Sequence, residues 1–369
     1  MNIRAVILLS LLSVLFAFVG FKPIADPKMV TYRTDPINSV IRIAAVGDIM
    51  MGSTYPIPIL PPNHGADLFK LISDELIDSE ITIGNLEGPL CDSGKPKKDS
   101  TKYRFIFATP TRYVKNLVAA GFDVLNLANN HIGDFDTFGI NTTKRVLDQV
   151  GIKYTGLKNS YADLIIKNKK VFVVGFSPYR RTNNLLDTHR AQKLIADLKR
   201  QGAIVIVTFH SGNEGVKHLH TKDSFEYFLD EPRGNVIKFA HSVIDSGADL
   251  VIGHGPHVPR ALEIYKNKLI AYSLGNFCTY GRFCLKKEQG LSLILKVDLD
   301  TLGNFVSGRI VPLYQEPPGI PKPDSLGRTI ELIRKLSLSD FPLSAPNIDS
   351  TGFITIQASI PPQLSPKYL

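Results

Sequence analysis

Polar residues that can hold a metal ion or move a proton stand directly after several apolar runs of this sequence. They carry carboxylate, amide and imidazole groups. The residues are Asp48 in GDIMMGS, Glu87 in GNLEGPL, Asn130 and His131 in ANNHIGD, His210 and Glu214 in FHSGNEG, and His254 and His257 in GHGPH. Such a set, rich in oxygen and nitrogen and without cysteine, suits Mn²⁺, Fe or Zn²⁺ and excludes a thiolate cage.

These polar positions become neighbours if the apolar runs before them are strands of a layered sheet. The carboxyl ends of such strands converge on one edge, so groups far apart in sequence meet there. A single histidine at a strand end is more often a capping or core residue than a ligand. Because polar residues recur at five strand ends, the coincidence favours one shared site, which we expect to hold one or two divalent ions.

Short apolar runs alternate with segments of helical spacing along most of the chain. The strands expected are residues 41–46, 81–85, 124–128, 171–176, 204–209, 250–253, 269–274, 291–299 and a run ending near Tyr314. The helices expected are residues 66–77, 112–120, 138–150, 190–200, 236–246 and 325–337. The strands between residues 171 and 253 are almost wholly apolar, as strands covered on both faces are. The pattern predicts an α/β fold, a layered β-sandwich flanked by helices.

Five strings of the sequence occur in an order that is typical of one protein family. They are GDIM, GNLEGPL, ANNHIGD, IDSGADLVIGHGPHV and AYSLGNF, and they lie between Gly47 and the P-L-Y that ends at Tyr314. In this set and order the sequence resembles the CapA family of capsule synthesis proteins, which is associated with poly-γ-glutamate. The resemblance implies a metallophosphoesterase-like fold of the calcineurin type, and a role in making or exporting an anionic extracellular polymer.

The phosphoesterase template implies a role for each matching residue. It implies metal ligands at Asp48, Glu87, Asn130, His210, His254 and His257, with Glu87 in the place of a bridging aspartate. It implies that His131 protonates the leaving group or steadies a phosphoryl oxygen. The final histidine pair is spaced one residue wider than in the usual GHxH string.

Met50 is the main departure from that template, because it occupies the position of a ligand histidine. A thioether is a soft, weak ligand for hard divalent metals. One of the two metal positions is therefore expected to bind more weakly or to be rebuilt, with Glu214 or water, and Glu214 joins His131 as a candidate catalytic residue. A two-metal site clamps both the attacking and the leaving oxygen, so its partial loss puts efficient phosphoesterase chemistry in question.

Two further residues are candidates for contact with substrate. Asn276, in YSLGNF, either orients a ligand histidine or touches substrate, and a turn-forming asparagine is the alternative. Arg233, in DEPRGNV, carries a guanidinium suited to bidentate binding of a carboxylate, and a surface charge at a helix entry is the alternative.

Four segments are expected along the chain. Residues 1–25 hold an uncharged apolar run after Arg4 and read as a signal peptide or, because the cleavage pattern is weak, an uncleaved membrane anchor. Residues 26–38 read as a linker, 39–316 as the CapA-like domain, and 317–369 as a Pro-rich extension with one helix. The domain is accordingly expected in the cell envelope, outside the cytoplasm.

The charge balance points to anionic partners. Lys plus Arg total 43 against 34 for Asp plus Glu, a formal net charge of +9. An anionic polymer or a phosphoester fits this balance, and a membrane synthase complex is the expected protein partner. Nucleic acid is not expected, because the cations are scattered and the sequence contains no Trp.

The three cysteines leave two readings open. Cys278 and Cys284 are close enough in sequence to bridge a short loop, which would leave Cys91 unpaired. Three incidental thiols are the other reading.

The sequence thus predicts an exported domain with a metal-dependent hydrolase-like site that serves an anionic extracellular polymer. The alternative is a non-catalytic accessory module that binds polymer or a synthase on the same fold.

Overall fold

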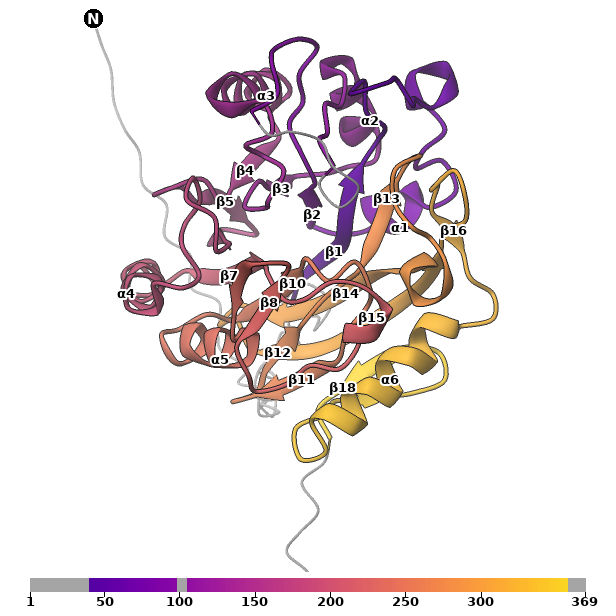
Figure 1. Ribbon diagram of the computed structural model, residues 1–369. Coiled ribbons are helices and arrows are strands. Elements are labelled where there is room, and N and C mark those ends of the chain that lie inside the picture. Colours follow the sequence, from indigo (N-terminus) through magenta and orange to yellow (C-terminus); the bar gives the residue numbers. More distant parts are fainter. Residues whose placement is uncertain (1–39, 98–104, 358–369) are drawn as a thin grey trace, which may run out of the picture. The chain divides into compact units, whose positions relative to one another are not determined.

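Two large β-sheets pack face to face in the computed structural model, which describes residues 40–97 and 105–357 (Figure 1). All of these residues fall in one of the two units of the chain, residues 36–369. The interface between the sheets is built from β-branched and leucine side chains such as Ile43, Ile83, Val173 and Ile206, all nearly or fully buried. The layered α/β sandwich expected from the apolar runs is therefore confirmed.

The first sheet has ten strands and combines parallel and antiparallel pairing. Its main path runs β17 (Asn347–Ile348), β18 (Phe353–Thr355), β15 (Phe305–Tyr314), β14 (Leu291–Asp300), β1 (Val40–Met50), β2 (Ile81–Leu86), β3 (Val124–Asn126) and β4 (Lys153–Thr155). Off this path, β13 (Asn276–Thr279) pairs with β1 and β16 (Lys322–Pro323) pairs with β15. Strands β1 to β4 run parallel, so their carboxyl ends share one edge.

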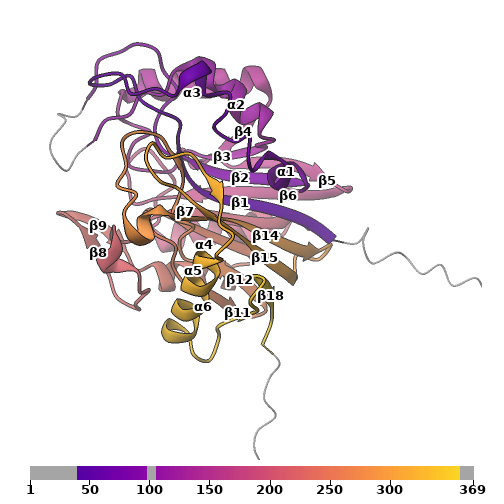
Figure 2. The ribbon, with the colours of Figure 1, turned by 90° about the vertical axis from the view of Figure 1, so that its right-hand side faces the viewer.

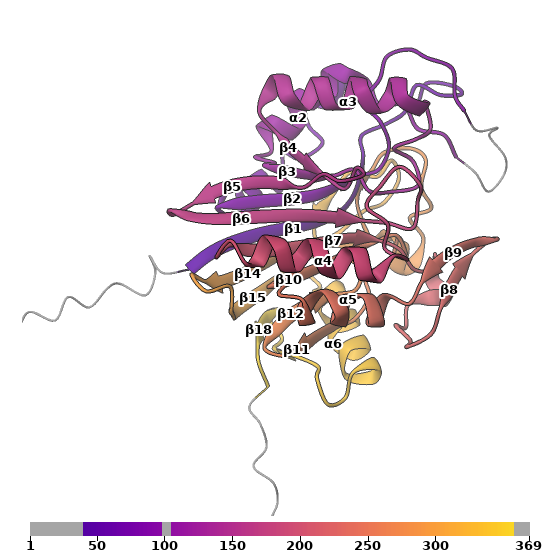
Figure 3. The same ribbon diagram turned by 90° about the vertical axis from the view of Figure 1, so that its left-hand side faces the viewer.

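The second sheet has six strands, in the order β11 (Leu262–Tyr265), β12 (Lys268–Ala271), β10 (Leu250–His254), β7 (Ile204–His210), β6 (Lys169–Phe176) and β5 (Ala162–Ile166). Its central strands β12, β10, β7 and β6 are parallel, and the edge strands β11 and β5 are antiparallel to them. A separate hairpin, β8 (Glu226–Phe228) and β9 (Glu231–Gly234), stands out from the two sheets in Figure 2 and Figure 3.

Helices cover the outer face of each sheet. The helices α1 (Ser73–Ile77), α2 (Val114–Ala119) and α3 (Asp136–Val150) pack on the ten-stranded sheet, and α4 (Thr188–Lys199) and α5 (Val236–Asp245) pack on the six-stranded sheet. Figure 3 shows α4 and α5 in front and α2 and α3 along the top. Short 3₁₀ turns span Pro62–Gly65, Thr111–Tyr113, Val216–His218 and Lys287–Gly290.

The helix expected over residues 66–77 is much shorter in the structure, where α1 begins only at Ser73. Between residues 65 and 72 the backbone makes bonds to the third residue back, such as Leu68 N–H to the Gly65 carbonyl and Ile72 N–H to the Phe69 carbonyl. Such bonds form isolated tight turns and not an α-helix. The apolar residues still face the core, which is why their spacing reads as helical.

Residues beyond 316, expected as an extension of the domain, belong to its fold. The strands β16, β17 and β18 add to the ten-stranded sheet. The one helix expected there is present as α6 (Arg328–Asp340), and its Ile330 and Ile333 join the core between the sheets. Residues 358–369 lie outside the described part of the chain.

Candidate functional site

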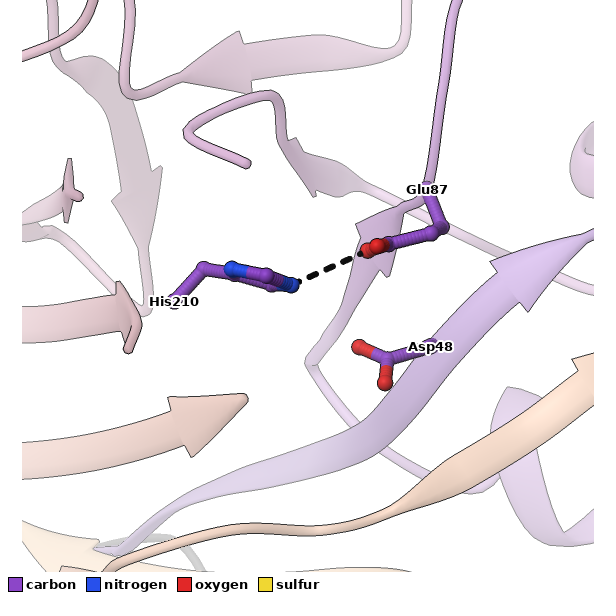
Figure 4. Close-up of side chains that lie close together, drawn as sticks. All are labelled: Asp48, Glu87 and His210. Atoms are coloured by element: carbon purple, nitrogen blue, oxygen red, sulfur yellow. Dashed lines mark ion pairs between the residues drawn. The ribbon is translucent and has the colours of Figure 1, made fainter. Parts of the chain in front are cut away.

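Three buried side chains from both sheets meet at the carboxyl ends of their strands. Asp48 lies near the end of β1, Glu87 directly follows β2, and His210 ends β7. One ligand atom from each lies within 4.8 Å of the others, and His210 Nε2 is 3.3 Å from Glu87 Oε2 (Figure 4). All three are at most 1% exposed. The cluster is of a size and chemistry that a single divalent ion would fit.

Strand register explains why these residues meet. In the ten-stranded sheet Asp48 stands opposite Asn85 on one side and Asn276 on the other. In the six-stranded sheet His254 stands opposite His210. Gly47 allows the close approach of β1 to the loop before β13, because a Cβ there would lie 1.9 Å from the Gly275 carbonyl oxygen.

The carboxylates are held by a network of amide side chains. Asn85 Nδ2 donates to Asp48 Oδ1 at 2.8 Å and to Glu87 Oε2 at 2.5 Å. Asn85 Oδ1 in turn accepts from Asn126 Nδ2 at 3.0 Å and from Asn129 Nδ2 at 3.2 Å. Both carboxylates therefore have fixed orientations, as outer hydrogen-bond partners give to metal-binding side chains.

Two of the imidazoles that face these carboxylates, His210 and His254, lack such a network of hydrogen bonds among the described residues. Neither ring nitrogen of His210 or His254 makes a well-aligned hydrogen bond within residues 40–97 and 105–357, although His210 Nε2 lies in ion-pair range of Glu87 Oε2 at 3.3 Å, and both side chains are fully buried. His254 Nδ1 lies 3.7 Å from Asp48 Oδ1. Burial, helped by the nearby His210, lowers the pKa of His254 to about 4 although Asp48 opposes this, so its ring is neutral at neutral pH. Neutral imidazole is the form that binds a metal.

Glu87 is ionised in this setting. Burial alone would raise its pKa, but the neighbouring His210, His131 and His257 outweigh burial and hold the pKa well below its usual range. Its Oε1 has no hydrogen-bond partner in the described part of the chain. A buried, ionised and incompletely bonded carboxylate beside unbonded imidazoles fits a bound cation.

His257 sits on a backbone that side chains rarely adopt, with φ of 58°. Strain of this kind persists where the surroundings fix it, and it concentrates at functional sites. Its Nδ1 is 2.8 Å from Asp48 Oδ2 and its Nε2 is 3.9 Å from Glu214 Oε2. Burial lowers the pKa of His257, but the hydrogen bond and charge of Asp48, with Glu214 and Glu87, outweigh it and raise the pKa to about 9.

His131 forms a dyad with Asp134. Its Nδ1 is 2.8 Å from Asp134 Oδ2, and the same oxygen accepts from the Phe107 backbone N–H at 2.9 Å. The Phe107 ring packs on the imidazole at 4.2 Å between centroids. The other nitrogen, Nε2, lies 4.0 Å from Glu87 Oε1. A carboxylate on one nitrogen fixes the ring and leaves the other to face the site.

The motifs that surround this site match a known family. A family model described as "Bacterial capsule synthesis protein PGA_cap" matches residues 42–280, well over half of the chain. This protein belongs to that family. The membership expected from the order of the strings is therefore confirmed for the capsule synthesis family.

Two curated relatives carry the same assignment. The "Capsule biosynthesis protein CapA" of Bacillus anthracis is 27% identical over 308 residues, which cover 78% of this chain and 70% of that protein. The "PGA biosynthesis protein CapA" of Bacillus subtilis is 30% identical over 284 residues, covering 71% and 68%. Among solved structures, a 5'-nucleotidase precursor of Thermus thermophilus aligns with a TM-score of 0.44 and 12% identity, over 80% of this chain and 58% of that one, less than two thirds of its length.

In this capsule synthesis family protein a cleft of about 400 Å³ opens beside the buried cluster. Asn130, His131, Glu214 and His257 line it, so the two histidines link the cleft to Glu87 and Asp48. Its other walls are mostly aromatic and basic, with Phe105, Phe107, Phe228, Phe283, Arg233 and Arg282, and they also include Leu229, Glu231, Cys284 and Gln289. A ligand with an anionic group and some apolar surface is complementary to such walls.

Arg233 lies in this cleft and is only 1% exposed. Its Nη2 donates to Glu214 Oε1 at 2.9 Å, and its guanidinium lies over the rings of Tyr179 and Phe228 at 5.6 and 5.1 Å. Nε and Nη1 have no hydrogen-bond partner among the described residues. Arg233 Nη2 also lies 3.5 Å from Glu231 Oε2, so the guanidinium is buried between two carboxylates with two of its donors unbonded in this part of the chain.

Asn276 is fully buried and is not among the residues that line the cleft. Its Nδ2 donates to the His257 carbonyl at 3.3 Å and to the Gln289 carbonyl at 3.1 Å. Of the two functional readings of Asn276, these bonds favour orientation of His257.

Met50, which occupies the position of a ligand histidine in the phosphoesterase template, is fully buried in β1.

The sequence did not predict the residues that position the side chains of the site, among them Asn85, Arg260 and Glu226. Asn85 stands two positions before Glu87 in the string that was recognised, yet its contacts depend on strand register. Arg260 and Glu226 form a buried ion pair, with Arg260 Nη1 and Nη2 at 3.0 and 2.9 Å from the two carboxylate oxygens. The pair fixes the β8–β9 hairpin that carries Arg233. No local pattern signals it.

The structure also answers whether the cysteines form a disulfide. Cys91, Cys278 and Cys284 are all free, so the bridge between Cys278 and Cys284 is absent among the described residues. Cys278 is buried in β13 and Cys284 is exposed, in agreement with the reading of incidental thiols.

The apolar run of residues 1–25 lies outside the described part. Within that part, the helices lack the length and apolar character needed to cross a bilayer.

Proposed function

We propose that this protein is a metal-dependent, hydrolase-like protein that acts outside the cytoplasm in the synthesis or export of an anionic polymer of the poly-γ-glutamate type. Family membership and the names of the two CapA relatives support the polymer role. The apolar run of residues 1–25 supports export. The geometry of the cluster supports the metal-dependent chemistry.

The observation that carries the metal site is the pair of buried imidazoles without hydrogen-bond partners, opposite carboxylates that are fixed in place. Burying polar atoms without partners costs roughly 1–3 kcal/mol each, which a bound cation would offset. The residues that would hold it are Asp48, Glu87, Asn130, His210, His254 and His257. When bound, the metal would act as a Lewis acid that activates water and polarises the substrate.

The residues of the cleft supply the remaining functions. His131, with Nδ1 held by Asp134, can pass a proton from Nε2 to a leaving group. Arg233 can bind an anionic group of the substrate through its free donors. Glu214 contacts both Arg233 and His257, so it couples substrate binding to the metal site. The bond broken would be a phosphoester or an amide.

Met50 gives specific support to a second candidate function. Without a histidine at this position the second metal of a phosphoesterase centre would be weakly held. In that case the same cleft would bind polymer or a membrane synthase and turn nothing over. Binding of polymer would then survive the loss of the metal ligands.

The full chain, kept in mild detergent, provides the test. Bound metal is measured after purification and after incubation with Mn²⁺, Fe²⁺ or Zn²⁺, and hydrolysis is measured with generic phosphoesters and γ-linked glutamyl amides. His254→Ala is compared with His189→Ala, a change at an exposed histidine of α4. We expect near-stoichiometric metal and hydrolysis in the wild type and in His189→Ala, and loss of both in His254→Ala.

Each outcome separates the two candidates. Stoichiometric metal without hydrolysis of any substrate would remove the enzymatic function and favour the accessory module. Absence of bound metal in the wild type at every ion tested would overturn the metal site itself.

A further inference from the structure

A second and larger cavity lies next to the cleft, outside the cluster of metal-binding residues. Its volume is about 650 Å³, and it is bounded by the loop after β6, one side of α4 and the segment before β5. Lys158, Arg180, Arg190 and Lys193 line it, against only two acidic residues, Asp187 and Asp197. We call this the α4 cavity.

The cations of the α4 cavity are not used for internal ion pairs. Within the described residues, none of the four takes part in a salt bridge, and Arg190 makes a single side-chain bond, from Nη2 to Asn159 Oδ1 at 2.7 Å. Both acids are engaged elsewhere. Asp187 accepts from the Arg190 backbone N–H and caps α4, and Asp197 pairs with Arg200. The cavity therefore presents an excess of positive charge to a ligand.

Tyr179 forms the wall between the α4 cavity and the cleft. It lines the cavity, its hydroxyl donates to Glu231 Oε2 at 3.2 Å, and its ring lies 5.6 Å from the Arg233 guanidinium. Glu231 and Arg233 both line the cleft. The α4 cavity and the cleft are thus one side chain apart at Tyr179.

The cavity also has an apolar part. Phe176, Pro178 and Leu194 line it together with the basic residues. An inorganic polyphosphate has no apolar surface to bury against these side chains, whereas a glutamate chain has methylene groups between its carboxylates. Guanidinium groups also match the planar carboxylate.

We propose that the α4 cavity is a second binding subsite, which holds carboxylates of an oligomeric chain while another part of the same chain occupies the cleft. This inference rests on the proposed function for the nature of the polymer, and it identifies the substrate as a chain and not a small molecule. Two linked contacts raise affinity without a new contact at the reaction centre. Affinity should therefore increase with chain length.

The test compares two double variants of the full chain. Arg180→Glu with Lys193→Glu reverses charge in the cavity. Lys144→Glu with Arg145→Glu makes the same change of net charge on α3, which packs on the other sheet. Thermal melting checks that both fold. Binding of a fluorescent γ-linked glutamate oligomer and of a γ-glutamyl dipeptide is measured by anisotropy after chelation of metal, so that the probe is not cleaved.

We expect the cavity variant to bind the long oligomer about tenfold more weakly than wild type at low ionic strength, with the dipeptide unchanged. The α3 variant should bind both probes like wild type. If the cavity variant does not fold, Arg180→Ala alone should show a smaller loss of the same kind. Equal binding of the long oligomer by the cavity variant, or Arg180→Ala, and the α3 variant overturns the subsite.

Polyphosphate is the competing ligand class. If it displaces the glutamate oligomer from wild type more effectively than unlabelled oligomer does, the carboxylate assignment is wrong. The same measurements in a His210→Ala background separate this proposal from the proposed function. A length effect that persists there supports the subsite even if no hydrolysis is ever found.

Discussion

The two sheets contribute different side chains to the site, and these side chains differ in how completely they are hydrogen-bonded. The ten-stranded sheet brings carboxylates that are fixed by amides, with Asn85 bonded to both Asp48 and Glu87. The six-stranded sheet brings His210 and His254, whose ring nitrogens have no hydrogen-bond partners among the described residues. Among the described residues, the carboxylate edge is hydrogen-bonded except at Glu87 Oε1, whereas both nitrogens of these two imidazoles lack a hydrogen-bond partner.

This difference indicates where a ligand belongs. If all of these residues were structural, both edges should be equally well bonded, since buried polar groups normally are. An incomplete imidazole edge facing a fixed carboxylate edge leaves room for a positive ion that both can bind. The comparison also predicts which substitutions should damage folding and which should damage only binding.

The largest effect is expected for the loss of a direct ligand. His210→Ala should weaken metal binding by more than the roughly 100-fold that loss of an outer hydrogen-bond partner can cause. Calorimetric titration of the metal-free chain measures this, with His189→Ala as the matched histidine control. Retention of wild-type affinity by His210→Ala would show that the imidazole edge does not bind the ion.

The next effect concerns the free energy of unfolding without metal, and it compares one substitution on the carboxylate edge with one on the imidazole edge. Asn85→Leu should destabilise the metal-free protein by about 2 kcal/mol, because two buried carboxylates lose a donor. His254→Leu should change it by less than about 1 kcal/mol, because the ring has no hydrogen bond to lose. Chemical denaturation after chelation measures both. A loss for His254→Leu as large as that for Asn85→Leu would contradict the comparison.

The third effect, which is the smallest when taken per pH unit, is the pH dependence of metal binding. His257 faces Asp48, Glu214 and Glu87 and has a pKa of about 9, so below that pH a metal that takes this ring must displace its proton. Apparent affinity should then rise about tenfold per unit between pH 7 and 9 and level off above. His254, with a pKa of about 4, is already neutral throughout this range.

The control for this measurement is His257→Gln, which should remove most of the rise between pH 7 and 9. If the slope is the same in His257→Gln as in wild type, His257 is not displaced from Asp48. It would then be a positioning residue and not a ligand.

Much of the site could be predicted because the chemistry stands at strand ends. Asp48, Glu87, His210 and His254 each follow an apolar run, and parallel strands must bring such ends to one edge. The layered fold was predictable because short apolar runs alternate with helical spacing, and the runs between residues 171 and 253 are almost wholly apolar.

What could not be predicted depends on register and on distant partners. Asn85 bonds to Asp48 because β1 and β2 pair with these two residues opposite, which no local pattern determines. The short strands β17 and β18 gave no apolar run long enough to recognise, although they extend the main sheet. The turns before α1 imitate helical spacing because their apolar residues happen to reach the same core.

The buried pair of Arg260 and Glu226 has a consequence for substitutions in the β8–β9 hairpin. It fastens the β8–β9 hairpin at its base, while Tyr227 and Leu229 nearer its tip remain 57% and 48% exposed. Residues at the tip can therefore be exchanged without disturbing either sheet. Substitutions in this short loop would change the wall of the cleft that Leu229 forms and leave Asp48, Glu87 and His210 in place.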